Sequence, residues 1–317
     1  MKILINGLGS IGCRHIKNLK AKGFRKIAGF DKSRIIANSA AKKFNIDIVN
    51  SYYQSIKDFD VIFICNPPSN HVPDTLAALK LNKYVFLEKP ISNKLAEARK
   101  LIKKKNIMVG FNMRFHPMII FLKKFIKKIG IIYNVQVEYG YDLLKARKNK
   151  NFNKGYYSTK NDGGVILDHI HELDYLELIF GRFVTIFCSA KKISNLKIKS
   201  FDNANLIMKN KLGFDLTLHL DYLQKKYKRS LKVITSEGIL ECDFSKNKLL
   251  FLKNNGSSFN KKFYDNFDET YIKEIDKFFY TIKNNKNFYP TVADCFRSSY
   301  LADRAYKSII SKKIIKL

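Results

Sequence analysis

Residues 163–175 carry the side chains best suited to acid–base chemistry, in the order Gly-Gly-Val-Ile-Leu-Asp-His-Ile-His-Glu-Leu-Asp-Tyr. Residues three apart share a face of a helix, so Asp168, His171 and Asp174 are expected to approach one another while His169 points elsewhere. A carboxylate can orient an imidazole, which makes His171 a candidate general acid and base. A half-buried structural histidine stays an alternative. A metal site is disfavoured, because His-x-His on a helix does not converge on one ion.

A second candidate is Glu88-Lys89-Pro90, which follows an apolar run. Pro90 restricts the backbone of Lys89 to extended conformations and so fixes the direction of its side chain. A lysine at a strand end can donate to a substrate oxygen or move a proton. The alternative is a solvated lysine, of which this chain has many.

The N-terminal residues predict a nucleotide site. An apolar run at residues 3–5 leads into Gly7-Leu-Gly9-Ser-Ile-Gly12 and then a helical stretch. The glycines permit a tight turn, close approach of a pyrophosphate, and packing of the helix on the strand. Asp31 follows the next apolar run and can bind a ribose 2′-OH, which favours NAD over NADP. Lys32 and Arg34 partly offset that charge, so NADP stays open.

A further turn, Asn66-Pro67-Pro68 with His71 at the next helix start, follows a third strand-like run. Ligands of open α/β sheets bind outside the carboxyl ends of the strands, so this turn is expected beside the dinucleotide. A rigid turn with a capping histidine is the alternative.

The elements that position these groups alternate over the first 118 residues, which predicts a doubly wound parallel sheet. Strands are expected at 2–6, 27–30, 61–65, 83–87 and 107–111, and helices at 12–22, 33–44, 70–81 and 93–105. A helix at 118–128 follows.

The remaining chain is rich in strands joined by tight turns, which predicts an α+β domain with an open, mainly antiparallel sheet. Strands are expected at 131–141, 182–193, 204–209, 214–222, 230–235, 238–243 and 248–252, and helices at 165–180, 269–283 and 292–310. The expected domains are 1–118 and 119–317, with helix 292–310 able to pack back on the first. Ligands are expected between the domains.

The net charge of +32 raises the question of nucleic-acid binding. Only ten of the 59 basic residues are Arg, and the lysines are spread along the chain without a basic tail. The charge therefore predicts solvated faces and attraction of anionic small molecules, not a nucleic-acid partner. No apolar run reaches the ~18 residues of a membrane span. Five scattered cysteines fit reduced thiols in a cytoplasmic protein.

These motifs, in this order and over the whole length, resemble the Gfo/Idh/MocA oxidoreductase family. Gly110-Phe-Asn112-Met-Arg114-Phe adds a further match. The resemblance implies a Rossmann domain, an open antiparallel substrate-binding sheet, and NAD(P)-dependent hydride transfer at a sugar or cyclitol hydroxyl. It also implies a homodimer or homotetramer that assembles through the sheet. The Asp168-x-x-His171 spacing is similar to that of a subgroup linked to surface-polysaccharide sugars.

By this resemblance the catalytic residues are Lys89, the acidic partner Asp168 and the acid/base His171. The residues expected at the cofactor are Gly7, Gly9, Ser10, Ile11, Gly12, Asp31, Asn66, Pro67, His71, Glu88 and Lys89. Those expected at the substrate are Lys89, Asn112, Arg114, Arg147, Tyr157, Asp168 and His171. No metal is expected.

The sequence therefore predicts an NAD-dependent oxidoreductase acting on a sugar, sugar nucleotide or cyclitol. One alternative is a glycosidase or epimerase that oxidises transiently and re-reduces with bound NAD. Another is a non-catalytic NAD sensor, which Lys89 and His171 argue against because a sensor needs neither.

Overall fold

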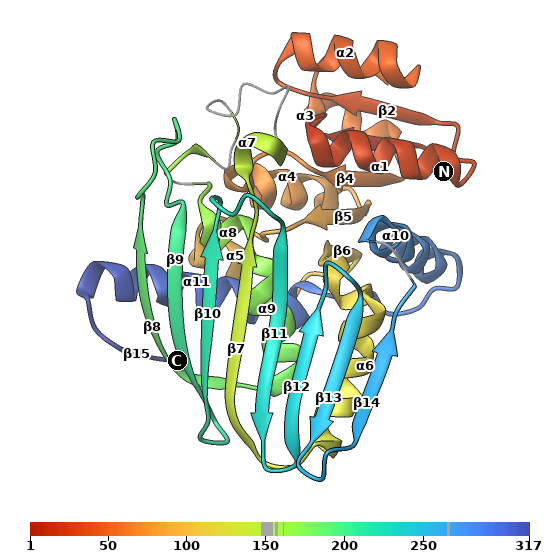
Figure 1. Cartoon of the computed structure of the whole chain (residues 1–317). Coiled ribbons are helices and arrows are strands. Elements are labelled where there is room, and N and C mark those ends of the chain that lie inside the picture. The colour runs from red at the N-terminus through yellow and green to blue at the C-terminus, as the bar shows by residue number, and fades with distance from the viewer. Residues whose placement is uncertain (147–154, 156–157, 161, 265–266) are drawn as a thin grey trace. The chain divides into compact units, whose positions relative to one another are not determined.

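The computed structural model describes residues 1–146, 155, 158–160, 162–264 and 267–317 (Figure 1). The chain forms two compact units. The first comprises Met1–Asn112 and Phe267–Ser299, and the second comprises Met113–Asn266 and Tyr300–Leu317. The first unit therefore combines the N-terminal part of the chain with a segment near its C-terminus.

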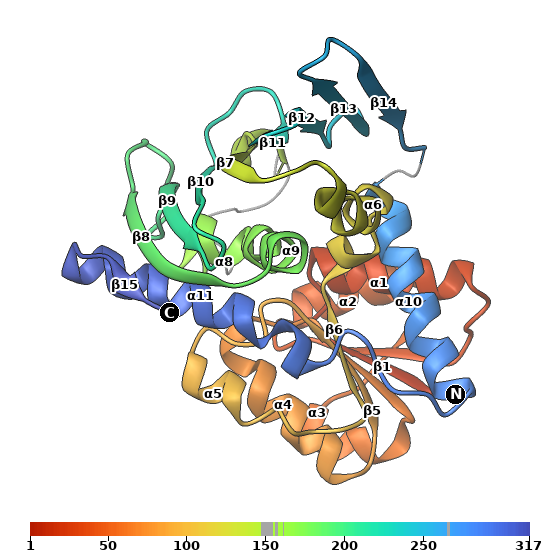
Figure 2. The ribbon, with the colours of Figure 1, turned by 90° about the horizontal axis from the view of Figure 1, so that it is seen from below.

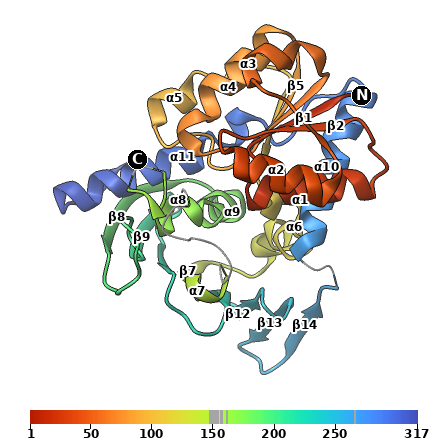
Figure 3. The same ribbon diagram turned by 90° about the horizontal axis from the view of Figure 1, so that it is seen from above.

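The first unit is built on a parallel six-stranded sheet of order β3-β2-β1-β4-β5-β6. Figures 2 and 3 show α1 and α2 on one face of this sheet and α4 on the other. Helices on both faces bury β1, β4 and β6 completely, which explains their continuous apolar runs. The elements are β1 Ile3–Asn6, α1 Ser10–Ala21, β2 Ile27–Phe30, α2 Arg34–Phe44, β3 Asp47–Ile48, α3 Tyr52–Ser55, β4 Val61–Ile64, α4 Pro68–Lys80, β5 Tyr84–Glu88, α5 Leu95–Arg99, β6 Ile107–Gly110 and α10 Phe267–Lys283.

Local signals fix several helix ends in this unit. Ser33 caps α2 by accepting from the Ile36 N–H, and Asn45 ends that helix in the left-handed conformation. Pro68 occupies the first turn of α4, where a missing N–H costs no hydrogen bond.

The helix expected over residues 93–105 is wrong in length, because α5 covers only Leu95–Arg99. The chain then tightens into bonds between residues three apart. Leu101 N–H donates to the Ala98 carbonyl and Lys104 N–H to the Leu101 carbonyl. Such bonds close turns rather than continue an α-helix.

The second unit holds a nine-stranded sheet of order β14-β13-β12-β11-β7-β10-β9-β8-β15. Every pairing is antiparallel except that of β10 with β7, so the sheet is mixed. Figure 2 shows α6, α8 and α9 on one face. The elements are α6 Pro117–Phe125, β7 Ile132–Gly140, α7 Leu143–Ala146, α8 Val165–Asp168, α9 Ile170–Phe180, β8 Phe183–Lys191, β9 Asn203–Asn210, β10 Asp215–Asp221, β11 Lys228–Thr235, β12 Gly238–Asp243, β13 Lys248–Lys253, β14 Ser258–Lys262 and β15 Ile315–Lys316. Helix α11, Val292–Ser311, begins in the first unit and ends in the second.

Alternation along the strands separates the two faces of this sheet. Leu216, Leu218 and Leu220 on β10 are buried, whereas Asp215 and Thr217 between them are exposed. This period of two is the pattern of a sheet with one face on a core. None of the described helices is both long enough and apolar enough to cross a membrane.

Candidate active site

The glycine loop between β1 and α1 has the shape that a dinucleotide requires. Gly7 has φ +99°, and a Cβ there would lie 2.4 Å from the Asn66 backbone nitrogen. A Cβ on Gly12 would lie 1.9 Å from the Gly7 carbonyl oxygen, so only glycine lets the helix pack this closely. A Cβ on Gly9 would meet nothing within 4 Å. The loop is therefore open at Gly9, where the backbone can approach a phosphate.

Helix α1 begins at this loop with Ser10 and Ile11. Its N-cap residue is Gly9, which has no side chain to cap the first turn. The N-terminus of a helix supplies N–H groups and a positive dipole end, which suit a pyrophosphate. These residues fit the cofactor that the sequence predicts.

Asp31 follows β2 and joins this loop to the next helix. Its Oδ2 accepts from the Leu8 N–H at 2.9 Å and its Oδ1 from the Ser33 N–H at 2.9 Å. Two backbone donors hold the carboxylate in place while the residue stays half-buried. This is a fixed negative charge beside the glycine loop.

The turn after β4 is held by a buried carboxylate that sequence reasoning missed. Asp74 Oδ2 accepts from the amides of Asn6 at 2.9 Å and Asn66 at 2.6 Å, and its Oδ1 accepts from the Tyr53 hydroxyl at 2.6 Å. The last bond is the main cause that raises the pKa of Tyr53 to about 12. Asn66 is thereby fixed at the end of the strand, with Pro67 preceding α4.

His71 lies inside the first unit rather than on its surface, with 1% of its area exposed. Its Nδ1 lies 2.7 Å from the Pro90 carbonyl oxygen and its Nε2 2.8 Å from the Asn66 carbonyl oxygen. Burial lowers the pKa of this imidazole, although both carbonyl contacts oppose the shift. The side chain links the Asn66 turn to the Lys89-Pro90 turn.

Glu88 ends β5 and Lys89 follows it, before a cis Lys89–Pro90 peptide bond. The Lys89 N–H donates to Glu88 Oε2 at 3.2 Å. Glu88 is 4% exposed and Lys89 is half-buried. The candidate catalytic lysine therefore follows a parallel strand directly, in the place where such sheets bind ligands.

In the second unit, the helix expected over residues 165–180 is broken in two. Helix α8 ends at Asp168 and α9 begins at Ile170, with His169 between them at φ −96° and ψ 25°. The His169 ring packs against Tyr139, Tyr141 and Tyr222, with ring centroids 4.3, 5.4 and 5.3 Å away. Asp168 and His171 therefore belong to different helices, and packing from distant strands accompanies the break.

Asp168 is held by two tyrosine hydroxyls. Its Oδ2 accepts from Tyr141 at 3.0 Å and from Tyr222 at 3.2 Å. Asp168 is 8% exposed and His171 is 7% exposed. Charge-assisted hydrogen bonds of this kind fix the orientation of a carboxylate. The two tyrosines are functional candidates that the sequence did not reveal, because they follow β7 and β10 and lie 27 and 54 residues from Asp168.

Asp174 has a partner that the helix pattern does not predict. Both of its carboxylate oxygens accept from Arg114, from Nε and from Nη2, each at 2.7 Å. This pair is buried, so Arg114 is a scaffold residue of the second unit as well as an expected substrate ligand. Asn112, in the first unit, donates through Nδ2 to Thr270 Oγ1 at 2.7 Å. Arg147 and Tyr157 lie outside the described residues.

A second buried ion pair lies next to His171 in the sequence. Arg229 Nε donates to Glu172 Oε1 at 2.7 Å. The guanidinium lies over the ring of Tyr139 at 4.5 Å, with Tyr175 at 5.6 Å. Burial raises the pKa of Glu172, opposed by the charge and the hydrogen bond of Arg229.

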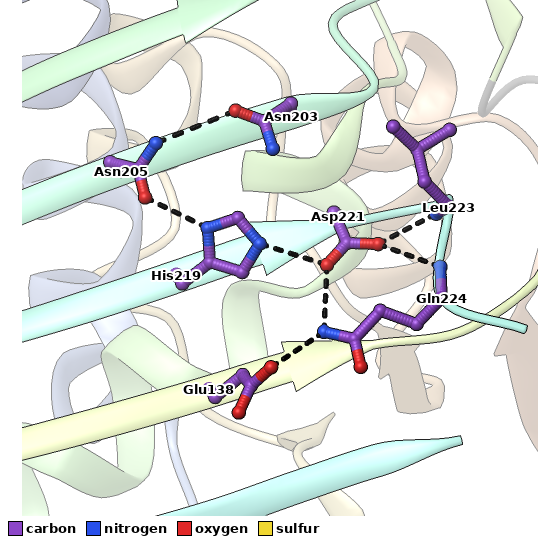
Figure 4. Close-up of polar contacts among 7 residues, drawn as sticks. All are labelled: Glu138, Asn203, Asn205, His219, Asp221, Leu223 and Gln224. Atoms are coloured by element: carbon purple, nitrogen blue, oxygen red, sulfur yellow. Dashed lines mark hydrogen bonds and ion pairs between the residues drawn. The ribbon is translucent and has the colours of Figure 1, made fainter. Parts of the chain in front are cut away.

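The face of β10 that is opposite to its buried leucines carries a polar network (Figure 4). His219 Nδ1 lies 2.8 Å from Asn205 Oδ1 and its Nε2 2.9 Å from Asp221 Oδ2. Asp221 also accepts from Gln224 Nε2, which in turn donates to Glu138. The Asp221 hydrogen bond is the main cause that raises the pKa of His219. Burial opposes ionisation of Asp221, but the bonds from His219, Gln224 and the Leu223 N–H lower its pKa overall.

Comparisons with known proteins agree with this architecture. Residues 1–109 match the GFO_IDH_MocA model, described as an oxidoreductase family with an NAD-binding Rossmann fold. Residues 123–317 match its C-terminal alpha/beta domain.

Sequence identity to individual relatives is low. The uncharacterized oxidoreductase YrbE of Bacillus subtilis is 32% identical over 194 residues, which cover 57% of this chain and 54% of that protein. Myo-inositol 2-dehydrogenase of Thermotoga maritima is 24% identical across 100% of this chain and 98% of its own length. The structure of levoglucosan dehydrogenase in complex with NADH superposes with a TM-score of 0.84 at 18% identity, covering 100% of this chain and 98% of that one.

Proposed function

Because the chain belongs to the Gfo/Idh/MocA oxidoreductase family, we propose that it transfers a hydride between NAD and a hydroxyl-bearing carbon of a sugar or cyclitol. The observation that carries the proposal is the pairing of two features. The first unit presents Lys89 directly after β5, and its glycine loop after β1 is open at Gly9. The second unit holds Asp168 through two tyrosines, three residues before a buried His171.

The nicotinamide, when bound, accepts or returns the hydride. An imidazole nitrogen of His171 takes the proton of the reacting hydroxyl in the oxidation and gives it back in the reduction. The Lys89 ammonium donates to the same oxygen and stabilises the negative charge that develops there. Asp168, oriented by Tyr141 and Tyr222, keeps the reacting groups in place.

The substrate class follows from family membership and from two relatives. One relative is named a myo-inositol 2-dehydrogenase and a structural neighbour a levoglucosan dehydrogenase. The proposal includes sugar nucleotides as substrates, because the net charge of +32 attracts such anions. In functional terms we propose residues 1–118 as the cofactor domain and 119–317 as the substrate domain. The five free cysteines suit the cytoplasm, which we propose as the location.

We also propose a homodimer or homotetramer that assembles through the outer face of the nine-stranded sheet. Ile207 on β9 and Leu252 on β13 leave 48% and 45% of their area exposed there. Apolar side chains left exposed among polar ones often mark a partner surface. Light scattering at micromolar protein tests the proposal, and a mass equal to the 36.8 kDa chain would contradict it.

The test of function is a screen of inositols, free sugars and nucleotide sugars for NADH formation. With the substrate found, Lys89→Met and His171→Asn should each lower kcat by about 10²–10⁴-fold. NAD affinity, measured by fluorescence, should change little. His169→Asn is the matched control, because its ring packs among tyrosines instead of facing the chemistry, and its effect should be much smaller. A stronger effect at His169 than at His171 would show that the proposal names the wrong histidine as the acid/base.

A further inference from the structure

Three buried ionisable side chains meet in the first unit, from segments that are far apart in the sequence. His15 comes from α1, Glu88 ends β5, and Glu274 comes from α10. Their exposures are 0%, 4% and 0%, and one polar atom from each lies within 4.8 Å of the others. Figure 3 shows α1 and α10 close together, and contacts join the two helices.

The two glutamates differ in their hydrogen bonds. His15 Nε2 lies 2.6 Å from Glu88 Oε1, and Glu88 Oε2 accepts from the Lys89 N–H at 3.2 Å. Within the described part of the chain, neither carboxyl oxygen of Glu274 has a hydrogen-bond partner, and neither has His15 Nδ1. An ionised carboxylate only accepts hydrogen bonds, so His15 donates to Glu88 through Nε2.

Aromatic rings surround the imidazole of this cluster. The His15 ring lies among Phe63, Phe86 and Tyr271, with ring centroids 5.2, 5.1 and 6.4 Å away. Arg14, on the same helix as His15, stacks on Tyr271 and pairs with the exposed Asp268. Its charge is thus directed outward and not at the carboxyl pair.

Two thiols and a second imidazole also lie near the pair. Cys13 lies on α1, Cys65 follows β4 and His71 lies on α4. Burial, and then the charges of Glu88 and Glu274, raise the pKa of the Cys65 thiol. Burial lowers the pKa of His71. Burial also raises the pKa of Glu274 well above its ordinary value, and the Glu88 charge adds to this. One proton on Glu274 removes the repulsion between two neighbouring carboxylates.

We propose that His15 and Glu274 are positioning residues for Lys89. Glu274 is uncharged, so that the cluster carries one negative charge, on Glu88. His15 donates to that carboxylate and holds it against the Lys89 N–H, which fixes the backbone from which the candidate catalytic side chain projects. These hydrogen bonds tie helix α1 to the catalytic end of β5, and an uncharged Glu274 allows α10 to pack beside them. This inference rests on the proposed role of Lys89, and its first test does not.

The first test reads the proton directly. Infrared difference spectra of the full-length wild type against Glu274→Gln, at neutral pH, should show the C=O stretch of a protonated carboxyl group that the variant lacks. Metal analysis of the same samples should show no stoichiometric ion. A missing carboxyl band would overturn the assignment of the neutral acid, and a bound metal ion would replace the proton as the compensating charge. Both readouts stand even if no polyol is a substrate.

The second test compares two substitutions of His15. Phenylalanine keeps a ring in the aromatic box and cannot donate, whereas glutamine can still donate to Glu88. His15→Phe should lower kcat by about 10- to 100-fold, as expected when a hydrogen bond to a charged group is lost and a catalytic group shifts. His15→Gln should recover part of this loss. NADH affinity and melting temperature serve as folding controls.

Equal kcat values for wild type and His15→Phe, with folding intact, would overturn the positioning role. Equal losses for the two variants would do the same, because they would show that donation to Glu88 is not what matters. Absence of turnover in the wild type, with the carboxyl band present, would instead count against the proposed function.

Discussion

Arg229→Met is expected to destabilise the second unit strongly and in a pH-dependent way. The Arg229–Glu172 pair has side-chain exposures of 2% and 0%, so methionine would fill the aromatic cage but leave the Glu172 carboxyl without its partner. Removing one member of a buried pair costs about 3–5 kcal/mol. At about 2–4 °C per kcal/mol, the melting temperature should fall by about 6–20 °C.

The sign of the pH dependence follows from burial. In the variant, Glu172 keeps the burial that raises its pKa and loses the arginine that opposes it. A carboxyl group whose folded pKa is raised binds more protons in the folded state, so stability falls as the pH rises above its unfolded pKa of about 4.3. The defect of Arg229→Met should therefore be larger near pH ~8 than near pH ~5.

Hydrogen–deuterium exchange with mass spectrometry is the suitable assay, because a chain of two units need not melt in one step. Peptides from α9 and β11 should exchange faster in the variant. Lys232→Met is the matched control on the same strand, since its 3.4 Å pair with Glu241 is exposed and such pairs contribute about 0–1 kcal/mol. Equal protection in both variants, or a melting shift under about 2 °C, would refute the reasoning.

Three further predictions follow from the site geometry. Asp31→Ser should weaken NAD binding and improve NADP binding, because it removes a negative charge from the ribose position; fluorescence titration of both cofactors measures this, and an unchanged preference would contradict it. Tyr141→Phe and Tyr222→Phe should each lower kcat by about 10-fold by removing a donor to Asp168, and additive effects in the double variant would contradict their action on one oxygen. His219→Gln should destabilise the protein below pH ~6.5 and progressively less as the pH rises through the raised folded pKa, since the charged imidazole is the form that its carboxylate partner stabilises. Thermal melts of wild type and variant across this range measure the difference, and a constant gap would contradict it.

Much of the first unit could be predicted because its signals are local. The glycine loop, Asp31 and the strand ends at Asn66 and Glu88 are all fixed by short-range patterns in the sequence. A parallel sheet then brings its carboxyl ends to one edge without further information. The early end of α5 at Arg99 escaped prediction, because residues 100–105 keep a helical composition while their bonds close turns.

The second unit was less predictable because long-range contacts decide its details. The break at His169 accompanies packing against three tyrosines from β7, β10 and their ends, and a continuous helical pattern hides it. Likewise, the spacing that groups Asp174 with His171 says nothing of Arg114, which is 60 residues away and binds both of its oxygens. Spacing shows which side chains share a face, whereas their partners depend on the tertiary fold.

The central claim is that a hydride passes between NAD and a carbinol carbon of a polyol substrate. The most direct measurement uses the substrate found in the screen, deuterated at its carbinol carbons, with mass spectrometry of the nucleotide after turnover. The account predicts deuterium in the NADH released and a slower rate than with the unlabelled substrate. Deuterium that returns to the product without net NADH would indicate transient oxidation. No deuterium in the nucleotide, with substrate consumed, would contradict the account.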